Sequence, residues 1–394
     1  MRLNGTPVHL VPYPARTVTN RRFAAADLSA LDRCFLPPAM TGLLDEPAPP
    51  SRAFVEDDNR SAVSPEPVAT YDGLDYHLSV KGIGSTVDPF SSHALDRLLA
   101  ATLTEEPDVR HRLGSPPVPT PSGEDERLVT GELWLRGSPY GGQGLAHAET
   151  ALRVSERADP TSIRGFRIAP VVKIAFLPPE LEARIRTIHW YRTFRGPIVQ
   201  ELRLVPSNVR IYFHSRTTVG SDVRHLYDRF GLDSDPRALA FELEYVRSAL
   251  AMLTLFARTL ERGADGDRYT GLDFLDVWLD KDAVLAPNGT VVFVDLEGVE
   301  PVAVERAEVG EKLEDQVYRS LYEFMFGYEQ IDGERRRRFG DAGSRKGRLA
   351  AIVGRALADD PFLRPVRSGA GLDLEIRNAL GDDALNTTFR LVDG

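Results

Sequence analysis

The sequence contains one cysteine, Cys34, among its 394 residues. A single cysteine excludes an internal disulfide framework and every zinc motif that needs several cysteines. The eight histidines form no HExxH-type pair, so a metal site built from histidines is not predicted either. Because a chain without disulfides suits a reducing environment, we expect a cytoplasmic protein.

Long hydrophobic runs and net positive charge are also lacking. A membrane span needs about 18 consecutive apolar residues, and no stretch of the sequence approaches that length. The first residues contain no continuous apolar segment typical of a secretory signal. The formal charge is −10, from 48 Lys and Arg against 58 Asp and Glu, which argues against general attraction to nucleic acid or anionic membranes. The four arginines after Glu334 are interpreted as a solvated helix face. We therefore predict no membrane partner and no nucleic-acid partner.

The chain divides into three parts by composition. Residues 1–70 contain the proline clusters LPPAM and PAPPS, and they are interpreted as an extended arm or loosely packed cap. Residues 71–205 are rich in strand-like patterns, including alternation over 76–80 and apolar runs over 166–176 and 198–205. Helices are predicted over 145–157 and from Pro179 to about Tyr191.

Residues 206–394 show mainly helical periodicity. Asp235 and Pro236 predict the start of a long helix, which is expected to end at Gly263. Two further helices are predicted, one around 313–324 and one over about 346–358. No predominantly parallel sheet is implied, so the sequence predicts an α+β fold.

A hairpin within this second half contains two aspartates. The segment WLDKDAVLAPNGTVVFVDLEG (278–298) predicts two strands joined by a turn at Pro287-Asn-Gly289. The hairpin brings Asp282 and Asp295 back toward one point, although they are 13 residues apart. In protein kinases, two residues placed across such a hairpin hold the magnesium ions that bridge ATP phosphates. We therefore predict a protein-kinase-like fold with a β-rich N-lobe and a helical C-lobe.

A lysine that could reach phosphates lies in LSVKGIGS. Lys81 ends a predicted strand, and Gly82 and Gly84 leave room for close approach of a ligand. Only five lysines occur in the chain. Lys173, in the apolar segment PVVKIAFLP, is the competing candidate for the same role.

A glycine-rich turn, GSPYGGQG (137–144), precedes the predicted helix over 145–157. That helix contains Glu149 and Glu156, and either carboxylate could pair with Lys81 as a helix glutamate does in kinases. Glu149 is preferred because it lies in the first turns, close to the glycine-rich turn.

Two short blocks resemble the selenoprotein O family. The segment YHLSVKGIGSTVDPF resembles the family's Leu-Lys-Gly-x-Gly-x-Thr-Pro-Phe/Tyr block, and PIVQELRLVPSNVRIYF resembles its Arg-Val-Ala-Pro-Ser-x-x-Arg-Phe block. Arg203 and Arg210 keep the family's interval of seven residues. GGQG and DLEG resemble the family's Gly-Asp-Gly and Asp-Tyr-Gly, and all four segments occur in the same order. The resemblance covers roughly residues 72–300.

The resemblance implies a kinase-like enzyme that binds ATP in an inverted orientation and transfers AMP to a hydroxyl of a protein or small-molecule acceptor. Carried over, Lys81 and the two arginines contact phosphates, Glu149 pairs with Lys81, and Asp282 and Asp295 hold Mg²⁺. Planar guanidinium groups suit phosphate oxygens and carboxylates suit Mg²⁺, so this chemistry is also coherent by itself.

The predicted catalytic segment departs from the family. Where the family has His-Gly-x-Met-Asn-Thr-Asp-Asn, this chain has LDFLDVWLDKDAVL at 272–285, so either Asp280 or Asp276 is the candidate base. Two alternatives to AMP transfer stay open: a kinase-fold phosphotransferase, and a catalytically inactive pseudokinase scaffold.

Overall fold

The computed structural model describes residues 7–24, 28–36, 50–58, 61–83, 143–187, 196–210, 223–263, 266–274, 282–340, 343–368 and 371–392. The chain splits into two compact units. The N-terminal unit comprises Leu3–Glu156 and Pro170–Val205, and the C-terminal unit comprises Met1–Arg2, Arg157–Ala169 and Pro206–Gly394. The secondary structure is mixed α and β, with one large antiparallel sheet, which agrees with the predicted α+β class.

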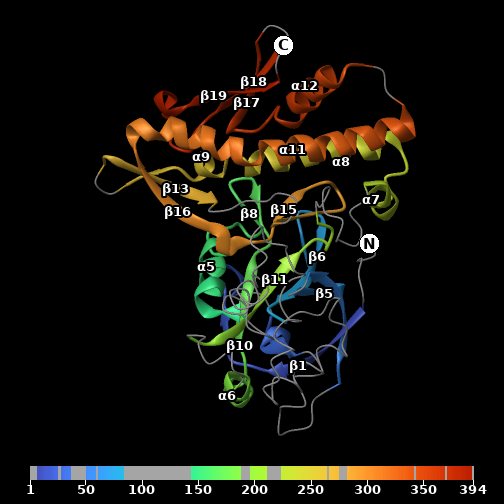
Figure 1. Ribbon diagram of the computed structural model, residues 1–394, viewed down its shortest axis with the longest axis vertical. Helices are drawn as coiled ribbons and strands as arrows, with labels where there is room; N and C mark the ends of the chain where they lie inside the picture. The colour runs from blue at the N-terminus through green and yellow to red at the C-terminus, as the bar shows by residue number, and fades with distance from the viewer. Residues whose placement is uncertain are drawn as a thin grey trace, which may run out of the picture. The chain divides into compact units, whose positions relative to one another are not determined.

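The N-terminal unit is built on a nine-stranded antiparallel sheet in the order β2-β10-β11-β6-β5-β4-β1-β3, with β7 paired to β11 (Figure 1). Its strands are β1 (Pro7–Pro14), β2 (Thr17–Thr19), β3 (Arg33–Leu36), β4 (Arg52–Asp58), β5 (Ser61–Tyr71), β6 (Leu74–Lys81), β7 (Gln143–Gly144), β10 (Val171–Phe176) and β11 (Ile198–Val205). Two helices accompany it: α5 (Leu145–Ser155), which packs against β10 and β11, and α6 (Pro179–Thr187).

The described residues among the first 70 do not form an extended arm or loose cap. Described residues of this segment form β1 to β5, and Leu10, Phe35 and Phe54 lie in the same hydrophobic core as the side chains of β6. The Gln200 side chain on β11 donates to the Phe35 carbonyl at 2.9 Å and accepts from its N–H at 2.8 Å. Strand β3 therefore covers β11, and the sheet curls around its core. Most residues of the clusters LPPAM and PAPPS lie outside the described residues, and Pro67 lies at an irregularity of the pairing between β5 and β6, where a sheet tolerates proline.

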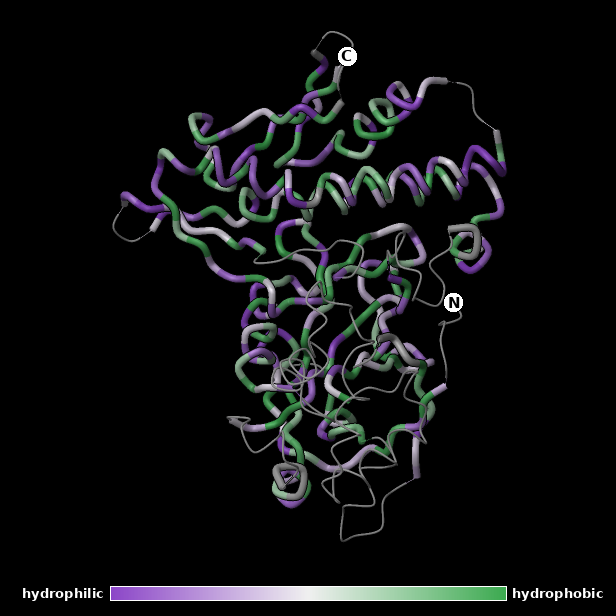
Figure 2. The backbone as a smooth tube through the Cα atoms, viewed as in Figure 1, coloured by the Kyte–Doolittle hydropathy of each residue, from purple (hydrophilic) through white to green (hydrophobic). Residues whose placement is uncertain are grey.

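Helices dominate the C-terminal unit. Its described helices are α7 (Val223–Arg229), α8 (Asp235–Met252), α9 (Leu255–Thr259), α11 (Val309–Phe339) and α12 (Arg345–Ala356). Helices α8 and α11 run side by side and antiparallel, since the Tyr245 hydroxyl donates to the Phe324 carbonyl while Arg335 pairs with Asp235 at the start of α8 (Figure 1). Hydrophilic and hydrophobic residues alternate along α11, as expected for a helix with one buried face (Figure 2).

The long helix predicted from Asp235 to Gly263 is interrupted. Helix α8 ends at Met252 and α9 begins at Leu255, with Thr254 between them at φ −121° and ψ 23°. The Thr254 hydroxyl bonds to the Leu250 and Ala251 carbonyls, which are acceptors at the end of α8. Apolar periodicity alone does not reveal this break.

The C-terminal unit also contains more strands than the sequence predicted. A three-stranded sheet comprises β12 (Glu261–Arg262), β13 (Arg268–Phe274) and β16 (Val299–Glu305), and another comprises β17 (Leu363–Ser368), β18 (Gly371–Ile376) and β19 (Thr387–Val392). Two short hairpins are formed by β8 (Ser162–Ile163) with β9 (Phe166–Arg167), and by β14 (Ala283–Leu285) with β15 (Val291–Phe293). The last pair confirms the predicted hairpin over residues 283–293.

Candidate functional site

One face of the N-terminal sheet is polar although it is buried. Side chains alternate between the two faces of a strand, and Tyr76, Leu78 and Val80 of β6 belong to the hydrophobic core. The residues between and after them on β6 therefore face the other way. Cross-strand pairing places Glu201 opposite Lys81 and Arg203 opposite Ser79, so residues of β11 continue this face. We call it the polar face, and its members are His77, Ser79 and Lys81 of β6, Glu201 and Arg203 of β11, and Ser61 of β5.

The ionisable groups of the polar face are almost completely removed from solvent. Lys81 is 3% exposed, Arg203 is 2% exposed and Glu201 is fully buried. Arg203 Nη2 donates to the hydroxyl oxygens of Ser61 and Ser79, each at 3.4 Å. Burying charges is costly unless other charges or hydrogen bonds compensate them. The described part of this face thus concentrates two cations and one carboxylate where electrostatic interactions are strong.

His77 adds a neutral imidazole to the polar face. Burial is the main reason that the pKa of His77 lies below its ordinary value. His77 Nδ1 lies 2.9 Å from the Ser64 carbonyl oxygen. Because a carbonyl oxygen only accepts hydrogen bonds, Nδ1 must be the protonated ring nitrogen.

The two competing lysines lie on opposite faces of the same sheet. Lys173 of β10 pairs with Leu202 of β11, after a register shift that follows Val171. Leu202 alternates with Arg203 and belongs to the hydrophobic core, so Lys173 is not on the polar face. Its ammonium group instead lies 2.5 Å from the Asp32 carboxylate. Lys81 is therefore the lysine that shares a face with Arg203.

Neither Glu149 nor Glu156 is placed as expected for a partner of Lys81. Glu149 is exposed on α5. The Glu156 carboxylate, just after α5, accepts a hydrogen bond from the Arg21 N–H and lies 3.7 Å from the Arg21 guanidinium. The carboxylate that the sheet places directly across from Lys81 is Glu201. Glu201 was not predicted from the sequence, although a glutamate two residues before Arg203 in a predicted strand puts both side chains on one face.

The glycine candidates are only partly described. Gly82 follows Lys81 at φ +96°, a left-handed conformation that favours glycine, so the chain turns away directly after β6. Gly84 and most of the glycine-rich turn lie outside the described residues. Within that turn, Gln143 is described, and its side-chain amide donates a hydrogen bond to Glu201 Oε1.

The hairpin of the C-terminal unit brings the two predicted metal ligands close together in the backbone. The Val294 N–H donates to the Asp282 carbonyl at 2.8 Å, so Asp295 is one residue removed from the position opposite Asp282. Asp282 is buried and Asp295 is half-buried. No group of three or more His, Cys, Asp or Glu side chains suited to a metal occurs among the described residues. Asp280 and Asp276, the candidate bases, lie outside the described part of the chain.

Arg203 and Arg210 fall in different units. Arg203 lies on β11, which ends the N-terminal unit, whereas Arg210 belongs to the C-terminal unit and pairs with Val284 of β14 in an isolated antiparallel bridge. Ser207 fixes this segment, because its hydroxyl donates to the Leu285 carbonyl at 2.5 Å and accepts from the Val209 N–H at 3.0 Å. The Pro-Ser turn thus attaches Arg210 to the hairpin that contains Asp282.

The arginine run near the end of α11 is used in ion pairs. Arg337 and Arg338 both bond to the buried carboxylate of Glu334, and Arg336 bonds to Asp332 one turn earlier. Arg335 lies 2.7 Å from the Glu242 carboxylate of α8. The arginines of this run therefore form ion pairs with carboxylates of α11 itself and of α8.

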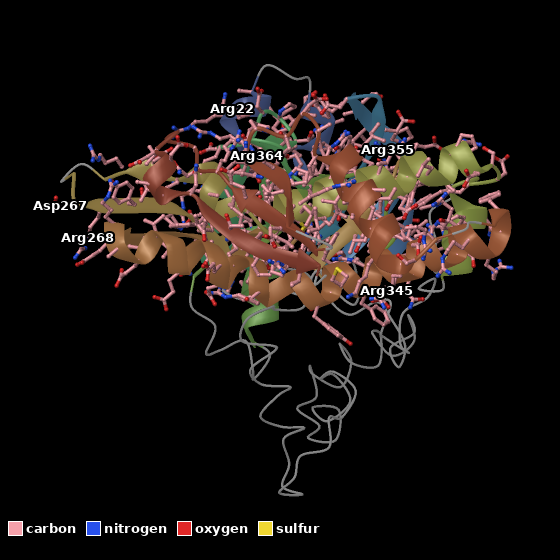
Figure 3. The ribbon with its side chains drawn as sticks, turned by 90° about the horizontal axis from the view of Figure 1, so that it is seen from above. Arg22, Asp267, Arg268, Arg345, Arg355 and Arg364 are labelled. Atoms are coloured by element: carbon pink, nitrogen blue, oxygen red, sulfur yellow. The ribbon has the colours of Figure 1, made fainter. Side chains whose placement is uncertain are left out.

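Exposed arginines also occur elsewhere in this unit, and some of them form ion pairs. Arg345, Arg355 and Arg364 are exposed, as Figure 3 shows for these labelled side chains. Arg345 forms an ion pair with Glu329, and Arg364 lies 2.5 Å from Glu375. Exposed pairs of this kind contribute little to stability.

Comparison with protein-family models, with curated proteins and with solved structures finds no match to this chain. No described helix combines the length and the apolar character that crossing a membrane requires.

Proposed function

We propose that this protein is an ATP- and Mg²⁺-dependent nucleotidyltransferase that transfers AMP to a hydroxyl group of a protein or small-molecule acceptor. The observation that carries the proposal is the polar face, where Lys81 and Arg203 lie together on adjacent strands. An ammonium group and a planar guanidinium group in a buried setting suit the oxygens of a phosphate chain. The resemblance of the blocks around these two residues to the selenoprotein O family supports AMP transfer.

Asp282 and Asp295 are proposed as the metal ligands, and Arg210 as one further cation. Mg²⁺ is usually held by one or two protein carboxylates together with substrate phosphates and water, so two aspartates are a sufficient set. Asp282 and Asp295 fit this requirement, since the hairpin holds their backbones close together. When bound, the metal would neutralise charge on the phosphates. Arg210, next to the same hairpin, is proposed to contact a phosphate, and Asp280 or Asp276 is proposed to orient the acceptor hydroxyl.

Labelled ATP tests the proposal. The full chain is incubated with Mg²⁺ and ATP labelled at either the α or the γ phosphorus, alone and with a cell extract as a source of acceptors. AMP transfer predicts that the α label is retained on an acceptor and that the γ label is not. Retention of only the γ label would replace the proposal by phosphoryl transfer. Asp295→Asn should abolish incorporation, whereas Asp359→Asn, at an exposed position of the same unit, should leave it unchanged.

A non-catalytic scaffold is the second candidate function. The observation that favours it is the burial of Lys81 and Arg203, because buried charges can also serve only to hold a sheet together. A scaffold predicts no transfer of either label and no change in ATP binding when Asp295 is replaced by Asn.

A further inference from the structure

Glu201 has a buried carboxylate, and only one of its two oxygens accepts a hydrogen bond from the described residues. Its side chain is fully buried at the centre of the N-terminal sheet. Oε1 accepts a hydrogen bond from the Gln143 side-chain amide. Within the described part of the chain, Oε2 is buried and accepts no hydrogen bond. An ionised carboxylate held away from water needs a compensating charge nearby, so a cation is expected within its reach.

The sheet register supplies that cation. Lys81 is the direct cross-strand partner of Glu201, on the same face. Directly opposed side chains in an antiparallel pair have Cβ atoms about 4.5–5.5 Å apart, and opposite charges at such positions attract. Both side chains are long enough to meet across that distance. Arg203 is two residues further along β11 on the same face, so Glu201 has one cationic residue across the strand pair and another along its own strand.

Gln143 fixes the direction of this carboxylate. It lies on β7, which pairs with the first residues of β11, and it directly precedes α5. Its amide N–H group holds Oε1, which leaves Oε2 as the oxygen available to a cation. A carboxylate held at one oxygen by a neutral amide can orient an ammonium group with the other.

We propose that Glu201, rather than the helix residue Glu149, is the residue that positions Lys81. Glu201 acts through Lys81 and does not itself contact the nucleotide. From the position directly across the strand pair, its carboxylate attracts the ammonium group of Lys81 toward the polar face. This role in nucleotide binding rests on the proposed function, whereas the pairing of Glu201 with Lys81 does not.

A double-mutant cycle on unfolding tests the pairing without nucleotide. The variants are Glu201→Gln, Lys81→Met and the double variant, and the unfolding equilibrium is measured for the full chain in denaturant. Each single variant leaves one buried charge without its partner, whereas the double variant removes both charges. We expect the double variant to be more stable than the sum of the single effects predicts, by roughly tenfold in the equilibrium constant. If a single variant does not fold, folding of the double variant alone gives the same answer.

The same cycle with Glu149→Gln in place of Glu201→Gln is the competing test, and Glu180→Gln, exposed on α6, is the control. Additive effects for Glu201 with Lys81, or coupling of Glu149 with Lys81, would overturn the proposal. ATP binding gives the second readout. We expect Glu201→Gln to weaken ATP binding by about tenfold, because outer partners that orient a binding group typically contribute 10–100-fold.

The two proposals fail in different ways. Coupling between Glu201 and Lys81 without any ATP binding by the wild-type chain would reject the proposed function and retain the pairing. ATP binding that is weakened by Lys81→Met and unchanged by Glu201→Gln would reject Glu201 as the positioning residue and retain the proposed function.

Discussion

Replacement of Gly289 by alanine should disrupt the hairpin that holds Asp282 and Asp295. Gly289 lies in the turn between β14 and β15 at φ +99°. A Cβ atom there would lie 2.9 Å from the carbonyl carbon and 3.0 Å from the Cα atom of Phe241 on α8, and closer still to its carbonyl oxygen. Because these are backbone atoms, a side-chain rotation cannot relieve the overlap.

Gly289→Ala should destabilise the protein for two reasons, backbone strain and steric overlap, and the same substitution at a second glycine measures the backbone strain alone. A left-handed backbone costs a residue other than glycine about 1–2 kcal/mol. Overpacking a well-filled site adds about 1–3 kcal/mol, so Gly289→Ala should destabilise the protein by about 2–5 kcal/mol. Gly381 has φ +69° with open space around the added Cβ atom, so Gly381→Ala should incur only the first cost.

Denaturant unfolding of both variants, followed by circular dichroism, measures the difference directly. We expect the midpoint to fall much further for Gly289→Ala than for Gly381→Ala. Incorporation of label from ATP should fall with it, since the turn sets the spacing of the aspartates. Equal destabilisation by the two variants would refute the argument that the turn packs tightly against α8.

Two further predictions concern buried charges of the C-terminal unit. Glu242 is fully buried, and desolvation raises its pKa to about 7, above its ordinary value of 4.5. Between these two pKa values the folded state therefore retains a proton that the unfolded state loses. The contribution of Glu242 to the free energy of unfolding should be fully present below about pH 4.5 and should fall by about 3 kcal/mol as the pH rises to 7. Glu242→Gln should remove this decline, and an unchanged pH profile of unfolding in that variant would contradict the assignment. Arg258 is 1% exposed, and its Nη2 donates to both carboxylate oxygens of Asp360 at 3.1 and 2.8 Å, so Arg258→Met should destabilise the protein by about 3–5 kcal/mol. Arg258→Lys should recover only part of this stability in thermal unfolding, because one ammonium group cannot also replace the Nε bond to the Thr254 hydroxyl and the Nη1 bond to the Arg164 carbonyl. Full recovery by lysine would refute that geometric reason.

Local patterns predicted individual elements better than they predicted the larger assembly. The strand over 198–205 is confirmed with its predicted limits, and all of its residues, polar ones included, are buried. The hairpin at Asn288 and Gly289 is confirmed because its turn residues have a specific conformational role. The first 70 residues were interpreted wrongly, since proline content describes local stiffness and does not show that Leu10 and Phe35 cover a distant core.

The candidate site shows the same limit. Lys81, Glu201 and Arg203 share a face because of the register between β6 and β11, and a register between strands that are far apart in sequence is not contained in either strand alone. The choice between Lys81 and Lys173 likewise depended on the register shift in β10. The preference for Glu149 followed a kinase analogy, whereas only strand pairing shows that Glu201 lies directly across from Lys81.

Titration of Mg²⁺-ATP into the full chain tests the central claim most directly. The matched variants are Lys81→Met and Lys173→Met, which replace two lysines of 3% and 4% exposure on opposite faces of one sheet. We predict that the wild-type chain binds ATP, that Lys81→Met weakens binding by at least about tenfold, and that Lys173→Met leaves it unchanged. The absence of ATP binding by the wild-type chain, or equal effects of the two variants, would contradict the assignment of the polar face as a phosphate-binding surface.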